Sequence, residues 1–385
     1  MNKKINIPFN KPYLTSKELE YIKDAHMRGH LSGDGYYTQL SHRLLEQSLN
    51  INKALLTHSC TAALEMMAIL ANLSPGDEVI MPSFTFVSTA NAVVLRGATP
   101  IFVDIRNDTL NIDESLITKA ITSKTKAIFP VHYAGVACEM DTIMKIADEY
   151  KLLVLEDAAQ GLFSKYKGKY LGTIGDMGAF SFHETKNIIS GEGGAIAINN
   201  QAYIERAEII REKGTNRNKF FRGQVDKYTW VDIGSSYLPS EIIAAFFVSQ
   251  FENAETINKK RVEKWNRYHN QLKDLEQLAY IRRPTIPKYS EHNGHLYYIL
   301  VNNLSVRTKI IEFLKSKGIL SVFHYIPLHS SPAGGKFGKV SGNMNVTDNI
   351  SDTLLRLPLY FEITNRQIDK VTYYIHQFFN RKLYE

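Results

Sequence analysis

The residue of this chain best suited to covalent chemistry is Lys186. The apolar segment Gly178–His183 predicts a buried strand, and Lys186 follows it shortly before the glycine-rich turn Gly191–Gly194. A lysine beyond a buried strand, beside a turn that lets backbone approach a ligand closely, is a candidate for a Schiff base with a carbonyl compound. A solvated surface lysine is the alternative, because lysine and arginine together number 46. The residues around Lys186 in the fold are needed to distinguish a Schiff-base lysine from a surface lysine.

A carboxylate stands at the end of the most apolar predicted strand. Residues 152–155 are Leu-Leu-Val-Leu, and Glu156 and Asp157 follow them, with Gln160 three residues further on. Burying a carboxylate is costly unless it meets a cation, and the protonated ring nitrogen of a pyridine cofactor is such a cation. An aspartate that caps the start of a helix is the alternative.

Two further features are typical of a ligand-binding sheet edge. Ser59, Cys60 and Thr61 follow the first predicted strand and open a helix, whose free N–H groups and positive dipole end favour a phosphate. Simple helix capping explains the same residues equally well. Phe86 lies shortly after another strand end, where it either stacks on a flat ring or belongs to the core. In an open parallel sheet such strand ends meet where ligands bind.

Composition and missing motifs exclude several classes. The net charge of +7 is scattered along the chain, which argues against a nucleic-acid partner. No apolar run reaches the roughly 18 residues needed to cross a membrane, and the first residues do not read as a signal peptide. Cys60 and Cys138 lie far apart and no His-Glu-x-x-His occurs, so we expect no metal site and a cytoplasmic location. The sequence also lacks a Walker loop, a dinucleotide fingerprint and a Gly-x-Ser-x-Gly elbow.

The elements that must position these residues follow an α/β pattern. From residue 53 to 155, short apolar strands alternate with amphipathic helices, which predicts a mainly parallel sheet covered by helices on both faces. The strands 178–182 and 195–198 have no helix between them and predict an antiparallel part of that sheet.

The second half of the chain predicts a smaller unit. A polar and aromatic loop, Gly214–Tyr237, is long enough to suggest a function, and a long helix over 240–272 follows it. A length of 385 residues predicts two domains. We place their boundary inside the long helix, which gives a large domain 1–250 and a smaller α+β domain 251–385.

Taken together, these residues resemble the DegT/DnrJ/EryC1/StrS family of sugar aminotransferases over nearly the whole chain. The most specific stretches are 156–160 (Glu-Asp-Ala-Ala-Gln), 181–187 (Ser-Phe-His-Glu-Thr-Lys-Asn) and 191–194. The resemblance implies an aspartate-aminotransferase-like fold, which is the type I fold of pyridoxal phosphate enzymes. It also implies a role for each matched position. Lys186 would bind pyridoxal 5′-phosphate covalently, Asp157 would pair with its ring nitrogen, Gln160 would contact its ring hydroxyl, Phe86 would stack on its ring, and Thr61, Ser181 and the backbone at Cys60 would hold its phosphate.

The resemblance further implies a homodimer with shared active sites. Many members place an Asn of the neighbouring subunit on the phosphate, in a Gly-Tyr-Asn run. The corresponding run here is Gly234-Ser235-Ser236-Tyr237, so Ser236 takes that position with a shorter side chain.

Three stretches are similar to one subgroup, the dTDP-4-amino-4,6-dideoxygalactose transaminases. They are 130–136, 213–217 and 323–329. They make Lys213, Arg217, His324 and Tyr325 the expected contacts of a nucleotide-linked keto-sugar. The expected reaction is amination of dTDP-4-keto-6-deoxy-D-glucose by L-glutamate, in surface polysaccharide biosynthesis. A gluco 4-amino product, a 3-amino sugar and a pyridoxal-phosphate-dependent sugar dehydratase stay open as alternatives. The dehydratases resemble this chain but carry His at the lysine position, and a binding protein with a degenerate site fits the complete residue set less well.

Overall fold

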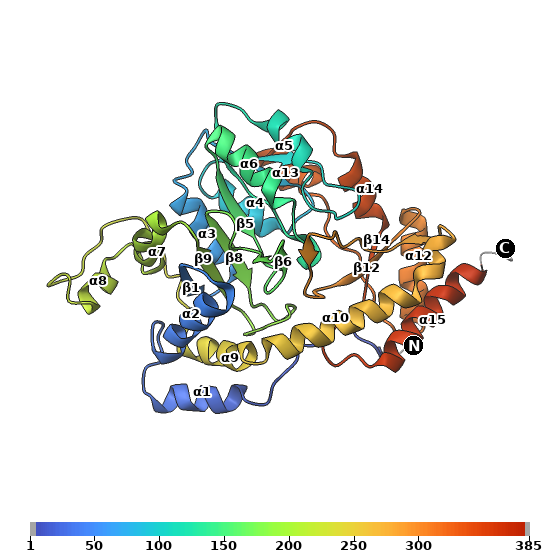
Figure 1. Cartoon of the computed structure of the whole chain (residues 1–385), viewed down its shortest axis with the longest axis horizontal. Helices are drawn as coiled ribbons and strands as arrows, with labels where there is room; N and C mark the ends of the chain where they lie inside the picture. The colour runs from blue at the N-terminus through green and yellow to red at the C-terminus, as the bar shows by residue number, and fades with distance from the viewer. Residues whose placement is uncertain (1–4, 382–385) are drawn as a thin grey trace.

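The computed structural model describes residues 5–381, the side chain of Arg381 excepted (Figure 1). Its strands are β1 (Lys53–Thr57), β2 (Glu78–Pro82), β3 (Thr99–Val103), β4 (Thr125–Ile128), β5 (Leu153–Asp157), β6 (Lys165–Tyr166), β7 (Lys169–Tyr170), β8 (Met177–Ser181), β9 (Gly194–Ile198), β10 (Ile281–Arg282), β11 (Ser290–Glu291), β12 (Tyr297–Val301), β13 (Lys339–Val340) and β14 (Leu354–Leu357).

Its α-helices are α1 (Glu18–Met27), α2 (Tyr36–Leu49), α3 (Cys60–Leu70), α4 (Val87–Val94), α5 (Glu114–Ala120), α6 (Met140–Tyr150), α7 (Ile204–Arg211), α8 (Arg217–Phe221), α9 (Glu241–Phe251), α10 (Ala254–Gln271), α11 (Lys273–Gln277), α12 (Leu304–Ser316), α13 (Pro332–Phe337), α14 (Asn345–Thr353) and α15 (Asn365–Arg381). Short 3₁₀ turns are η1 (Tyr133–Gly135), η2 (Gln201–Tyr203) and η3 (Leu328–Ser330). Among these described helices, none combines the length and the apolar character that a membrane crossing needs.

An eight-stranded mixed sheet forms the centre of the molecule. Its order is β1-β9-β8-β5-β4-β2-β3-β13. β9 runs antiparallel to both of its neighbours, and the remaining pairs are parallel. The predicted mainly parallel sheet with an antiparallel part is therefore confirmed.

Helices cover both faces of this sheet, because successive strand side chains point to opposite sides. In β1, Ala54 and Leu56 join a core with α2, α5, α6 and α9, whereas Leu55 joins a second core with α3, α4 and α7. Both faces are apolar, as expected for strands buried between two helical layers.

A smaller α+β unit follows α9 in the chain. Its antiparallel sheet has the order β10-β12-β14, and side chains of α10, α12 and α15 pack on it in a separate core. Segments are exchanged with the large sheet: β13 pairs with β3, and Ile7 packs in the core of the small unit. The division at residues 250 and 251 remains a prediction.

One prediction about this region is wrong. The expected single helix over 240–272 is two helices, α9 and α10, separated at Glu252 and Asn253. The side-chain amide of Asn253 donates to the carbonyl of Ser249 at 3.0 Å. Asparagine side chains compete with the backbone for such bonds, which favours a helix end over a continuous helix.

Candidate active site

One cavity of about 1160 Å³ lies at the carboxyl ends of the parallel strands, between the large sheet and the small unit. Segments from the sheet ends, from the first turn of α3 and from the strand loops of the small unit line it together. Nine of the residues predicted from the sequence lie along its wall: Cys60, Thr61, Phe86, Asp157, Gln160, Ser181, Lys186, His324 and Tyr325.

Lys186 lies in the turn between β8 and β9, and its backbone amide donates to the carbonyl of His183 at 2.9 Å. The side chain is partly buried, and no carboxylate of a described residue lies within ion-pair distance of its amine. Burial lowers the pKa of the Lys186 amine, while the nearby Cys60 and Asp157 act in the opposite direction. A lowered pKa leaves a larger fraction of the lysine in the neutral form, which is the form that acts as a nucleophile or general base.

Asp157 is the last residue of β5 and is only 4% exposed. Its carboxylate accepts hydrogen bonds from the Thr89 hydroxyl at 2.7 Å and from the Ala159 amide at 3.1 Å. The alternative that Asp157 caps a helix is wrong, because turns follow it instead of a helix. Among the described residues, no cation pairs with it. A buried carboxylate in this state fits the protonated ring nitrogen of pyridoxal phosphate.

The N-terminus of α3 forms another part of the wall. Ser59 caps this helix, because its hydroxyl accepts from the Ala62 amide at 3.1 Å, and the Thr61 hydroxyl bonds to Ser88 at 2.8 Å. A Cβ at Gly194 would lie 2.4 Å from the Cys60 nitrogen, so only glycine lets β9 come this close to the helix end. The first amides of a helix lack intrahelical partners, so this end suits the cofactor's phosphate.

The small unit supplies the opposite wall. The Gln160 side-chain oxygen accepts from the Ala134 amide at 2.7 Å, and its nitrogen donates to the Tyr325 hydroxyl at 3.0 Å. His324 Nδ1 bonds to the Tyr133 hydroxyl at 2.6 Å. Thus Gln160 links the two walls of the cavity.

Phe86 is 58% exposed and lines the cavity, so it is not a core side chain and its ring is free to stack.

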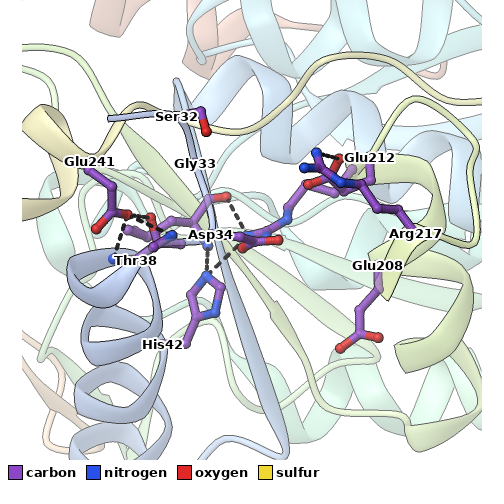
Figure 2. A network of polar contacts seen from close by, with 12 residues as sticks. Ser32, Gly33, Asp34, Thr38, His42, Glu208, Glu212, Arg217 and Glu241 are labelled. Carbon is purple, nitrogen blue, oxygen red and sulfur yellow. Dashed lines mark hydrogen bonds and ion pairs between the residues drawn. The ribbon is translucent and has the colours of Figure 1, made fainter. Parts of the chain in front are cut away.

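Three predicted residues do not reach the cavity of their own chain: Lys213, Arg217 and Ser236. Lys213 and Ser236 lie near the two ends of the 212–237 segment, and Arg217 is the first residue of its helix α8. This helix stands away from the body of the molecule (Figure 1). Arg217 forms an ion pair with Glu212 at 3.6 Å (Figure 2). Lys213 has a positive φ of 63°, and its amide donates to the Ser235 carbonyl at 3.0 Å. Their assignment as ligand contacts therefore requires a second copy of the chain.

A buried polar network holds the base of this segment (Figure 2). The Arg211 guanidinium is 1% exposed, donates to His42 Nε2 at 3.0 Å and forms an ion pair with Asp34. Next to it, the Glu241 carboxylate accepts from the Tyr37 amide at 2.7 Å and from the Thr38 amide at 3.0 Å. The turn before α2 is thus tied to α7 and to α9.

Sequence reasoning missed several cavity residues of the small unit, among them Arg356 on β14 and His295 just before β12. The Arg356 guanidinium donates to the Phe323 carbonyl at 3.0 Å and faces the ring of Phe9 at 4.8 Å. Among the described residues, no carboxylate pairs with it. The available signal was a single charge inside the apolar run Leu354–Leu357, because an unpaired charge in a strand is costly unless a ligand meets it.

Comparison with known proteins agrees with this geometry. The sequence profile of the DegT/DnrJ/EryC1/StrS aminotransferase family matches residues 12–376. GDP-perosamine synthase of Escherichia coli O157:H7 is 31% identical over 98% of this chain and 99% of its own. Spr1654 of Streptococcus pneumoniae, solved in its PMP and PLP forms, is 27% identical, and its PMP form has a TM-score of 0.91 over 98% of this chain and 100% of its own.

A third similar protein is Helicobacter pylori PseC, an aminotransferase involved in the biosynthesis of pseudoaminic acid. It is 27% identical, with a TM-score of 0.87 over 97% of this chain and 99% of its own. With Lys186, Asp157 and the end of α3 around one cavity, this chain belongs to the DegT/DnrJ/EryC1/StrS family and is a pyridoxal-phosphate-dependent sugar aminotransferase of fold type I.

Proposed function

We propose that this enzyme transfers the amino group of L-glutamate to carbon 4 of dTDP-4-keto-6-deoxy-D-glucose. The products are dTDP-4-amino-4,6-dideoxy-D-galactose and 2-oxoglutarate, made in the cytoplasm for a surface polysaccharide such as enterobacterial common antigen or O-antigen. The observation that carries the proposal is the position of His324 and Tyr325. Both belong to the 323–329 stretch that resembles the 4-aminogalactose subgroup, and both line the cavity that contains Lys186.

Three cavity residues take definite parts in this reaction. Pyridoxal phosphate, when bound, supplies an electrophilic carbon and an electron sink. The Lys186 amine removes the α-proton of the amino donor and, in the second half of the cycle, delivers a proton to carbon 4 of the sugar. Asp157 stabilises the positive charge on the ring nitrogen. Arg356 holds a carboxylate of the donor through charge-assisted hydrogen bonds.

The carboxylate role of Arg356 follows from its charge and its surroundings. The guanidinium depresses the pKa of the Lys186 amine, after burial as the main cause, so the two cations lie within electrostatic reach of each other. A donor that reacts at Lys186 brings its carboxylate into the same region, where it relieves this repulsion. A contact with the diphosphate of the sugar nucleotide is the alternative role of Arg356, and the concentration dependences of the two substrates separate the two roles.

A GDP-linked keto-sugar is the second candidate substrate. It is favoured by the 31% identity to a GDP-perosamine synthase over nearly the whole chain. A gluco product or amination at carbon 3 changes only the pose of the sugar over Lys186. A dehydratase reaction is less favoured, because Lys186 is a lysine and the dehydratases that resemble this chain carry His there.

A panel of dTDP-, UDP- and GDP-linked 4-keto-6-deoxy sugars, each offered with L-glutamate, tests the proposal. Mass spectrometry identifies which nucleotide sugar gains the amine, and proton NMR of the product gives the ring stereochemistry. We expect the dTDP sugar to react and the H3–H4 coupling to be small, as an axial amine requires. Lys186→Ala is the control and should give no product.

Three results would contradict parts of the proposal separately. A large H3–H4 coupling means an equatorial amine and a gluco product. Amination at carbon 3 removes the subgroup assignment but leaves a sugar aminotransferase. Loss of a hydroxyl group without gain of nitrogen identifies a dehydratase.

A further inference from the structure

His295 presents an unused hydrogen-bonding atom to the cavity. The residue is 9% exposed, and it lines the cavity just before β12. Its ring Nδ1 lies 3.2 Å from the side-chain oxygen of Asn187, the residue that follows Lys186. Its backbone amide is also held, by the Asn293 side-chain oxygen at 3.0 Å. The ring is therefore positioned by the elements on both sides of the cavity.

The hydrogen bonds of Asn187 determine which ring nitrogen of His295 carries the proton. The Asn187 side-chain nitrogen donates to the Asn293 carbonyl at 2.9 Å and to the Asn258 side-chain oxygen at 2.8 Å. A carbonyl accepts only, so this end of the Asn187 amide is the NH₂ group and the other end is the oxygen. That oxygen also accepts only, which makes His295 Nδ1 the donor.

The Nε2 atom of His295 is then a lone-pair acceptor as long as the ring is neutral. Burial is the main cause that lowers the pKa of His295, and the surrounding Lys186, Arg261, His324 and Arg356 lower it further. Among the described residues, none hydrogen-bonds to Nε2. A neutral imidazole with a free acceptor atom thus faces the cavity.

We propose that His295 Nε2 accepts a hydrogen bond from a hydroxyl group of the keto-sugar and thereby selects for that hydroxyl. The inference rests on the proposed function and adds a residue that determines specificity. L-Glutamate shares the cavity, but its carboxylates offer only acceptor atoms, and its amino group, the one donor it carries, must be at the reacting centre beside Lys186. A sugar hydroxyl offers the donor that Nε2 lacks.

The hydroxyl at carbon 3 is the one that His295 should contact. His295 bonds to Asn187, the residue that follows Lys186, so it lies near the lysine that delivers the proton to carbon 4. In a 4-keto-6-deoxy sugar, carbon 3 is the neighbour of carbon 4 that carries a hydroxyl, because carbon 5 carries the methyl group.

Two variants test the roles of the two ring nitrogens of His295 separately. His295→Asn keeps an amide donor at the position of Nδ1, facing Asn187, but removes the acceptor at Nε2. His295→Gln places an amide oxygen at the position of Nε2 and gives up the contact to Asn187. The ligands are dTDP-6-deoxy-D-glucose, which has no ketone and does not react, and its 3-deoxy analogue. Isothermal titration of the holoenzyme gives the dissociation constants.

We expect His295→Asn to bind dTDP-6-deoxy-D-glucose about tenfold more weakly than the wild type, the effect of one lost hydrogen bond, with His295→Gln in between. The wild type should bind the 3-deoxy analogue more weakly by a similar factor, a measurement that needs no variant. For the 3-deoxy analogue, His295→Asn and the wild type should bind equally. With L-glutamate alone, the change in reaction rate caused by His295→Asn should be clearly smaller than its tenfold loss of affinity for the sugar nucleotide.

Equal affinity of the wild type for the 3-hydroxy and 3-deoxy ligands would overturn the inference. So would a loss in His295→Asn that persists with the 3-deoxy ligand, or a matching slowdown with L-glutamate alone, since either means a structural role. Failure of the proposed function would be seen in a separate measurement, because the wild type would then not aminate the dTDP keto-sugar at carbon 4.

Discussion

At the scale of single residues, the site combines a desolvated base with a buried acid. Lys186 and Asp157 line one cavity, and burial lowers the pKa of the lysine while the aspartate partly offsets that effect. Neither has an ion-pair partner among the described residues. A buried carboxylate without an ion-pair partner is costly, and a protonated pyridine ring bearing an aldehyde would supply both the cation that Asp157 lacks and a carbonyl carbon for the Lys186 amine.

Asp157→Asn should slow the half-reaction with L-glutamate by roughly 100-fold or more, because an electrostatic contribution of a few kcal/mol to the transition state is lost. Stopped-flow absorbance of the holoenzyme measures this rate. Asp104→Asn is the matched control: Asp104 is 3% exposed and accepts from the Thr347 amide at 2.8 Å, but it lies outside the cavity. The control should lose stability and keep its rate. An unchanged rate in Asp157→Asn would refute the cofactor role.

Arg356→Gln should raise the L-glutamate concentration at half-maximal rate about tenfold or more, because a charge-assisted hydrogen bond to the carboxylate is lost. Arg356→Lys should recover part of the loss. Arg282→Gln is the control, since Arg282 is a partly buried arginine on β10 of the same small sheet that does not line the cavity. If instead only the sugar concentration dependence changes, Arg356 binds the sugar diphosphate.

At the scale of elements, the N-terminus of α2 depends on a residue 200 positions away in the chain. Its own cap, Gly35, has no side chain, and a Cβ there would lie 2.7 Å from a Glu241 carboxylate oxygen. Glu241 instead caps the helix from the start of α9, with bonds from the Gly35, Tyr37 and Thr38 amides and from the Thr38 hydroxyl. Helices with buried ends need such partners.

Glu241→Ala should lower the free energy of unfolding by about 2 kcal/mol or more, because it leaves several buried amides without an acceptor. Glu241→Gln keeps one acceptor oxygen and should cost less. Glu255→Ala is the control: Glu255 is exposed in the first turn of α10, and its loss should change stability by at most about 0.5 kcal/mol. Urea unfolding followed by circular dichroism measures all three. Equal effects of Glu241→Ala and Glu255→Ala would show that the cap contributes nothing.

At the scale of the whole molecule, we propose a homodimer in which the 212–237 segment reaches the cavity of the partner. Lys213, Arg217 and Ser236 lie outside the cavity of their own chain, and Ser236 is exposed. The segment also carries exposed aromatic side chains, among them Phe221 and Trp230. The Arg211–Asp34 ion pair, directly before the segment, ties its start to the turn before α2.

Subunit mixing tests this arrangement. Lys186→Ala subunits, reassembled with Ser236→Trp subunits, should recover about a quarter of the wild-type activity, because half of the dimers are mixed and each contains one intact site. Lys186→Ala mixed with Asp157→Asn is the control and should recover nothing, since both residues line the cavity of the same chain. Equal recovery in the two mixtures, with subunit exchange demonstrated by mass spectrometry, would place Ser236 within its own chain's site.

Local patterns were sufficient to predict the sheet, the strand ends and the residues that follow them. Lys186, Asp157 and Ser59 to Thr61 stand where an apolar strand gives way to polar residues, and that change is readable because strand burial is a short-range property. The alternation of strands and helices determines that these ends meet at one edge of the sheet. Nine of the predicted residues accordingly line one cavity.

Contacts between segments far apart in the sequence decided those features of the site and the fold that local patterns did not predict. Nothing near His295 in sequence predicts that Asn187 orients its ring, and Arg356 becomes a ligand-binding residue only because no carboxylate reaches it in the folded chain. The break between α9 and α10 depends on the Asn253 side chain, which donates a hydrogen bond to a backbone carbonyl. Lys213 and Arg217 have suitable charges, but the fold turns them away from their own cavity. Charge and hydrogen-bonding type are local properties of a residue, whereas the partner that satisfies them is selected by packing across the whole chain.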